Sequence, residues 1–327
     1  MHPKIMLRPV GWVLSAVGIA SVAISVMLSV PLKRPPLLNS IHDGAVAVSE
    51  LARPPVTEFQ ARDGTTLAYR LYPARNGSTD RVAIVIHGSA GSSGDMHAVA
   101  QALADAGVTA VAVDIRGHGG SGTRGDIAYI GQLDDDLDDL VALLRKSYPE
   151  TRLSVVAHSS GGGFGLRIAS EAEGKVFDRF VLLAPELGYS APTSRPLEGT
   201  AHWANADVPR IIALGLMRRA GIDWAQSLPV VAFATAPTAK QVTWRYSYRL
   251  LANFGPPSDW KAALSRVAAP VDIIAGEKDE LMFADEYSET IRPYAGKVSS
   301  KVLPAVDHMG VIREPAALAA IVADVKQ

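Results

Sequence analysis

The most informative segment of the sequence is Leu153-Ser-Val-Val-Ala157-His158-Ser159-Ser160-Gly161-Gly162-Gly163. An apolar run, typical of a buried strand, enters an Ala-x-Ser-x-Gly turn and continues into a predicted helix. A turn this tight strains its central residue and needs small residues two positions before and after it. Centring the turn on Ser160 would put His158 at a small-residue position, so we place Ser159 at the centre.

A glycine-rich turn between a strand and a helix can also bind a nucleotide phosphate. Neither G-x-G-x-x-G nor G-x-x-x-x-G-K-[ST] fits this turn, and no basic residue follows it to meet a phosphate. We therefore interpret the turn as one that presents a serine side chain.

Outward from the turn, short apolar runs recur that are typical of strands buried on both faces. A hairpin is indicated by Asp63-Gly64, which separates two strand-like segments at the start of the domain. The remaining predicted strands are Arg81–Ile86, Thr109–Ile115, Phe180–Ala184, Val271–Ala275 and, more weakly, Lys301–Leu303.

Predicted helices alternate with these strands. Met96–Ala106 is rich in alanine, and Leu133–Lys146 has its leucines on one helical face. The acidic run Asp134–Asp136 could hold a metal ion, but its charges suit the first turn of a helix, and we interpret it as a solvated face. The alternation predicts an α/β fold with a mainly parallel central sheet and helices on both faces.

Residues 186–260 depart from this alternation of strands and helices. This interval contains four of the five tryptophans, and proline and glycine punctuate it. We expect a small helical cap inserted over the carboxyl edge of the sheet. Its tryptophans are Trp203, Trp224, Trp244 and Trp260.

The composition excludes several classes of protein. The 327 residues carry a formal net charge of -1, and the basic residues do not cluster in the globular part, so nucleic acid is not an expected partner. The chain has no cysteine, which excludes disulfides, thiolate catalysis and cysteine-ligated metals.

The N-terminus differs from the rest of the chain. No charge occurs from Val10 to Val30, and as a helix this segment would span roughly 30 Å, the thickness of a bilayer core. We predict a single transmembrane anchor within residues 1–34, with the main domain facing outward. Cleavage of a signal peptide and secretion is the alternative, although the nearest suitable site, Ala45-Val46-Ala47, lies far downstream.

The next segment, residues 35–55, is rich in proline and predicts a linker. Residues 56–327 then form the main domain, with the cap inside it. No repeat or low-complexity tract is present.

The turn around Ser159 resembles the nucleophile elbow of the α/β-hydrolase superfamily, with Ala157 in place of the commoner first glycine. The loop His87-Gly88-Ser89 resembles the oxyanion loop of that family, and the segment Asp114–Ser121 resembles its Asp-x-Arg-Gly-x-Gly-x-Ser motif. The resemblance covers residues 57–327 and is greatest to the branch of monoglyceride lipases and serine aminopeptidases.

This resemblance implies a triad in the order serine, acid, histidine. Ser159 is then the nucleophile and His308, just past the last predicted strand, is the base. Asp279 matches the Gly-x-x-Asp spacing of the family, while Glu277 and Glu280 remain alternatives for the acid.

The resemblance also implies an oxyanion hole made of two backbone N–H groups. We expect these to be Ser160, directly after the nucleophile, and Ser89. His87 is expected to brace its loop rather than to act on substrate. Asp307, next to the base, is expected to fix the loop that carries His308.

The implied activity is that of a serine hydrolase which cleaves a carboxylic ester, lipid-like or small, through an acyl-enzyme. The partner is then a small acyl substrate, and neither a metal nor a cofactor is implied. An aminopeptidase or amidase, an acyltransferase, and a catalytically silent binding protein remain open as alternatives. The sequence is silent on oligomeric state.

Overall fold

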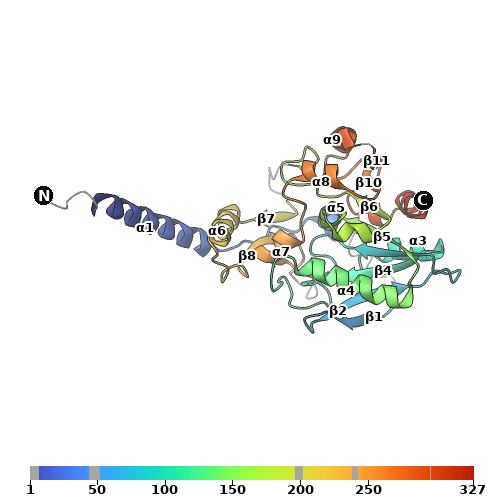
Figure 1. Ribbon diagram of the computed structural model, residues 1–327. Coiled ribbons are helices and arrows are strands. Elements are labelled where there is room, and N and C mark those ends of the chain that lie inside the picture. Colours follow the sequence, from blue (N-terminus) through green and yellow to red (C-terminus); the bar gives the residue numbers. More distant parts are fainter. Residues whose placement is uncertain (1–6, 44–51, 196–201, 238–241, 295) are drawn as a thin grey trace.

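The computed structural model describes residues 7–43, 52–195, 202–237, 242–294 and 296–327. At its centre is an eight-stranded sheet in the order β1-β2-β4-β3-β5-β6-β10-β11 (Figure 1). The strands are β1 (Val56–Gln60), β2 (Thr66–Tyr72), β3 (Arg81–Ile86), β4 (Thr109–Asp114), β5 (Arg152–His158), β6 (Arg179–Leu183), β10 (Val271–Gly276) and β11 (Val298–Leu303).

The sheet is parallel except at one edge. β2 pairs antiparallel with both β1 and β4, and every other neighbouring pair of this sheet is parallel. β5 lies between β3 and β6, with Ala157 opposite Ile86 on one side and Leu182 on the other. The predicted α/β class with a mainly parallel sheet is therefore confirmed.

Helices cover both faces of the sheet because the central strands are apolar on both sides. In β3, Val82, Ile84 and Ile86 belong to one core cluster, and Ala83 and Val85 belong to the other. The first cluster includes side chains of α4 (Gln132–Ser147), α5 (Ser160–Ala169), α8 (Trp260–Arg266) and α9 (Glu286–Ile291). The second includes side chains of α3 (His97–Asp105) and α10 (Pro315–Lys326).

The cap interval contains α6 (Val208–Arg219) and α7 (Tyr248–Asn253), which fits the expected helices. It also contains an antiparallel sheet that the sequence did not indicate. Its strands are β7 (Ala204–Ala206), β8 (Pro229–Phe233) and β9 (Arg245–Ser247), and short 3₁₀ turns lie elsewhere at Glu173–Val176, Arg292–Tyr294 and Gly310–Ile312.

The N-terminal segment requires a correction. It forms helix α1 (Leu7–Ser29), yet in the part of the chain that the structure describes no helix is long and apolar enough to cross a bilayer. The prediction of a membrane-anchored protein is therefore wrong.

Instead, the carboxyl end of α1 packs against the cap (Figure 1). Ile24 and Leu28 contact an apolar cluster that includes Leu214 and Met217 of α6. The guanidinium of Arg210 donates a hydrogen bond to the carbonyl oxygen of Val30. Part of the apolar surface that suggested a lipid environment thus contacts protein.

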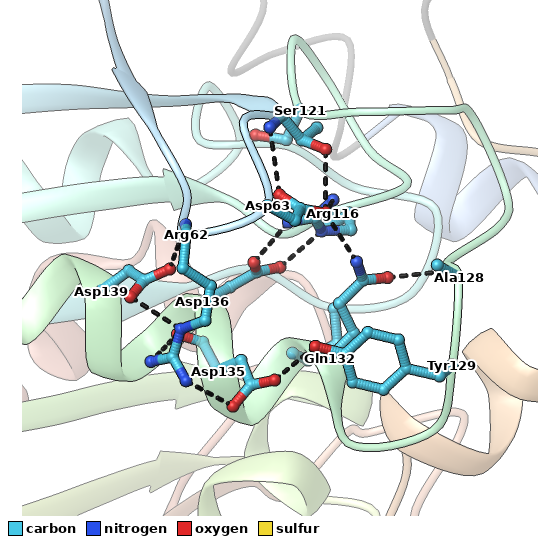
Figure 2. A network of polar contacts seen from close by, with 12 residues as sticks. Arg62, Asp63, Arg116, Ser121, Ala128, Tyr129, Gln132, Asp135, Asp136 and Asp139 are labelled. Carbon is cyan, nitrogen blue, oxygen red and sulfur yellow. Dashed lines mark hydrogen bonds and ion pairs between the residues drawn. The ribbon is translucent and has the colours of Figure 1, made fainter.

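A buried arginine holds the segment Asp114–Ser121 to the rest of the domain (Figure 2). Nη1 of Arg116 lies 2.9 Å from Asp63 Oδ2, and Nη2 lies 2.6 Å from Asp136 Oδ1. Nε2 of Gln132 donates to the same Asp63 oxygen at 2.9 Å. These contacts join the β1–β2 turn to α4.

Replacing this buried arginine should cost much more stability than replacing an exposed one. In Arg116→Met, two carboxylates lose their partner, and we expect the free energy of unfolding to fall by about 3 kcal/mol. Arg62 also pairs with α4, but its side chain is 47% exposed, so Arg62→Met should cost less than about 1 kcal/mol. Urea unfolding of both variants measures the difference, and equal losses would contradict this account.

Candidate active site

The predicted site residues follow four parallel strands of the central sheet, with β6 lying between the second and the third of them. Ser159 follows β5, the loop with Ser89 follows β3, Asp279 follows β10 and His308 follows β11. Because the carboxyl ends of parallel strands lie at the same edge of the sheet, residues far apart in the sequence come together here.

Ser159 lies in a sharp turn between β5 and α5. Its backbone has φ 55° and ψ −120°, a conformation that residues with a side chain rarely adopt. A Cβ atom at Gly161 would lie 2.3 Å from the carbonyl oxygen of His87, so glycine is required at that position. The small-residue pattern in the sequence therefore has a steric cause.

The imidazole of His308 lies between the hydroxyl of Ser159 and the carboxylate of Asp279. Its Nε2 lies 3.1 Å from Ser159 Oγ, and its Nδ1 lies 2.8 Å from Asp279 Oδ2. All three side chains are buried. If Nδ1–H donates to the carboxylate, Nε2 is left as an acceptor for the serine hydroxyl proton.

The electrostatics of the Asp279–His308 pair favour the ionised form of Asp279. Burial alone would raise the pKa of Asp279, but His308 and the N–H groups of Leu281 and Met282 outweigh it and hold that pKa below its ordinary value. Burial alone would lower the pKa of His308, but the charge and hydrogen bond of Asp279 outweigh it and raise that pKa.

The structure distinguishes the three carboxylates that the sequence left open. Glu277 accepts a hydrogen bond from Ala305 N, and Glu280 accepts one from the backbone N–H of His308 at 3.1 Å. Only Asp279 reaches the imidazole among these three. Asp307 accepts from Gly310 N and pairs with Arg313 at 3.0 Å, within the loop that carries the histidine.

The loop after β3 lies directly against Ser159. A Cβ atom at Gly88 would lie 3.0 Å from Ser159 Cβ. His87 is buried and braces this loop: Nδ1 contacts the carbonyl oxygen of Gly88 at 2.7 Å, and Nε2 accepts from Ile115 N at 3.2 Å.

A pocket of about 760 Å³, partly open to solvent, leads to the triad. Ile41 and His42, which we assigned to the linker, contribute to its wall, and Ile41 is buried against the core. Asp95 is the one acidic residue among the described lining residues. The apolar side chains of the lining include Ile41, Met96, Trp203, Leu281, Met309 and Ile312.

Two contributors to the site were missed by sequence reasoning. His158 donates through Nε2–H to the carbonyl oxygen of His308 at 3.1 Å, and burial lowers the pKa of His158 to about 3. Arg195, at the edge of the cap, donates to the carbonyl oxygens of Asp279 and Met282. Only the position of His158, next to Ser159, could have drawn attention to it.

Comparison with known proteins identifies the family. The family model described as serine aminopeptidase, S33, matches residues 77–315. The chain belongs to this family. It is therefore an α/β-hydrolase, as the motifs around Ser159 indicated.

Lipases and esterases are among the relatives and solved structures that this chain resembles. A monoacylglycerol lipase of Mycolicibacterium smegmatis is 27% identical over 252 residues, which are 72% of this chain and 82% of the relative. A variant of the monoglyceride lipase of Saccharomyces cerevisiae, solved with a substrate analogue, has a TM-score of 0.61 at 18% identity and covers 85% of this chain and 95% of its own. Est1E of Butyrivibrio proteoclasticus, solved with ferulic acid, has a TM-score of 0.58 at 18% identity and covers 83% of this chain and 96% of its own. The family and these relatives indicate a hydrolase of the lipase and esterase type.

The electrostatic pairing of His308 with Asp279 can be tested without any substrate. We expect the imidazole of His308 to titrate above its ordinary value of about 6.5. In Asp279→Asn the carboxylate charge is lost and burial dominates, so the pKa should fall below that value. NMR titration of labelled histidines measures both, and an unchanged pKa in the variant would contradict the pairing.

Proposed function

We propose that this protein is a serine hydrolase that cleaves carboxylic esters through an acyl-enzyme on Ser159. The observation that carries the proposal is the contact of Ser159 Oγ with His308 Nε2 at 3.1 Å, beside a largely apolar pocket. A serine hydroxyl is a weak nucleophile until a base takes its proton, and this geometry supplies the base.

The proposed reaction has two stages. Ser159 Oγ attacks the ester carbonyl while His308 Nε2 takes its proton, and Asp279 stabilises the imidazolium. His308 then gives the proton to the leaving alcohol. In the second stage His308 takes a proton from water, the hydroxide attacks the acyl-enzyme, and the carboxylic acid leaves as Ser159 recovers its proton.

The negative charge on the carbonyl oxygen needs two donors. Ser160 is the first residue of α5, where a backbone N–H has no acceptor inside the helix. Ser89 lies in the loop after β3, next to Ala90, whose own N–H is taken by the hydroxyl of Tyr246. The N–H groups of Ser89 and Ser160 are therefore the proposed oxyanion hole.

The pocket favours an uncharged acyl substrate. Its lining is mainly apolar, and its one acidic side chain among the described residues, Asp95, already accepts the N–H of Ser92 at 2.8 Å. A lipid-like ester suits such a pocket, as the names of the lipase relatives also suggest. The membrane anchor, which would have favoured the same substrate, no longer supports it.

The proposal is tested with a fluorophosphonate probe and a series of p-nitrophenyl esters of increasing chain length. We expect labelling on Ser159, located by peptide mapping, together with ester turnover. In Ser159→Ala, labelling should disappear and kcat should fall by at least about 10⁴-fold, because the acyl-enzyme cannot form. Ser265→Ala, a substitution of the same type on α8, should leave both unchanged.

Three results would contradict the proposal in different ways. Turnover of peptides with a free amino terminus, without turnover of esters, would favour an aminopeptidase, as the description of the family suggests. Folded protein that neither reacts with the probe nor turns over any ester would favour a binding protein without catalysis. Transfer of the acyl group to added alcohols in preference to water would indicate an acyltransferase.

A further inference from the structure

The loop after β3 contains a strained residue. Ala90 has φ 61°, in the left-handed region that residues other than glycine rarely occupy, and it is buried. Such a conformation persists only where the surrounding structure holds it. The neighbouring N–H, that of Ser89, is one of the two proposed oxyanion donors, so whatever holds Ala90 also sets the direction of that donor.

The contacts that hold Ala90 and Ser89 come from the three-stranded sheet of the cap and the residue directly before it. Tyr246 of β9 accepts the N–H of Ala90 through its hydroxyl oxygen at 2.7 Å. Trp203, directly before β7, donates Nε1–H to Ser89 Oγ at 2.7 Å. Phe233, at the end of β8, lies between the two rings, with centroids 5.6 Å from Trp203 and 4.6 Å from Tyr246.

The hydroxyl of Tyr246 has a fixed orientation. It lies 2.6 Å from His118 Nε2, and His118 Nδ1 lies 3.2 Å from the carbonyl oxygen of Ile115. Burial holds the pKa of His118 well below its ordinary value, so the ring is neutral at physiological pH. With Nδ1–H donated to Ile115, Nε2 accepts the Tyr246 proton, and the hydroxyl oxygen is left to accept Ala90 N–H.

The cap strand that carries Tyr246 is itself tied to the main domain. Ser247 N donates to the carbonyl oxygen of Gly125 at 2.9 Å, and Thr243 Oγ1 donates to that of Gly117 at 2.8 Å. Tyr246 is 1% exposed and does not line the pocket. It can therefore influence the reaction through the loop but does not touch the substrate.

We infer that Tyr246 is a positioning residue for the oxyanion hole: it fixes Ala90, and so directs the N–H of Ser89 at the reacting carbonyl oxygen. This inference rests on the proposed function. It gives the cap a catalytic purpose besides covering the pocket, because its small sheet and the β3 loop form one hydrogen-bonded unit.

Tyr246→Phe tests the inference, since it removes one oxygen atom and keeps the buried ring. We expect kcat on p-nitrophenyl esters to fall by about 10- to 100-fold with KM changed less than about twofold, because a misdirected donor weakens only the transition state. The affinity for a trifluoromethyl ketone, which forms an oxyanion on Ser159, should fall by a similar factor. The exchange rate of the Ala90 amide hydrogen should rise.

A second cap tyrosine is a matched control. Tyr248 lies in α7 and contacts the apolar cluster between α6 and α1, away from the β3 loop. Tyr248→Phe should leave kcat, ketone affinity and Ala90 exchange unchanged.

The possible results separate the two proposals. If the wild type turns over esters and Tyr246→Phe retains kcat and ketone affinity within twofold, even with a lower melting temperature, the role of Tyr246 is structural and the inference is wrong. If wild-type protein neither reacts with fluorophosphonate nor hydrolyses esters, the proposed function fails and the catalytic part of the inference fails with it. The exchange measurement then still decides whether Tyr246 anchors Ala90.

Discussion

The strained backbone of Ser159 sets the geometry of the site. Its positive φ is unfavourable, and several hydrogen bonds hold it in place. Ser159 N donates to the carbonyl oxygen of Leu183 at 2.9 Å, while Gly163 N and Glu186 N both donate to the carbonyl oxygen of Ser159, at 3.0 and 3.1 Å. The turn is therefore fixed by β6 on one side and α5 on the other, and the serine hydroxyl faces the imidazole of His308, which follows β11, three strands along the sheet from β5.

The parts of this arrangement that follow from local physics could be read from the sequence. The run before Ser159 is apolar because β5 is buried on both faces, and Gly161 is required because a side chain there would meet the backbone of the neighbouring loop. The predicted strand bounds lie within about three residues of the observed ones, because the other central strands are also buried and apolar. Asp279 and His308 could be named because motifs place them after β10 and β11, but only the distances separate Asp279 from the nearby glutamates.

Other parts depend on contacts between distant segments and left no local signal. β7 and β9 have three residues each, too short for an alternating pattern, so the sheet of the cap was missed. The hydroxyl of Tyr246 meets Ala90, which is 156 positions away in the sequence. Hydropathy alone could not tell a helix that crosses a bilayer from α1, whose carboxyl end packs against α6.

The contact of Ile41 with the pocket has a consequence for how such an enzyme can change its substrate. A short helical segment at residues 39–43 forms part of the wall, but it lies outside the sheet and outside the turns that hold the triad. Substitutions there can alter the shape of the pocket without straining the turn that carries Ser159. This part of the pocket wall and the turns that hold Ser159, Asp279 and His308 thus lie in separate stretches of the chain, and the first can diverge while the second is kept.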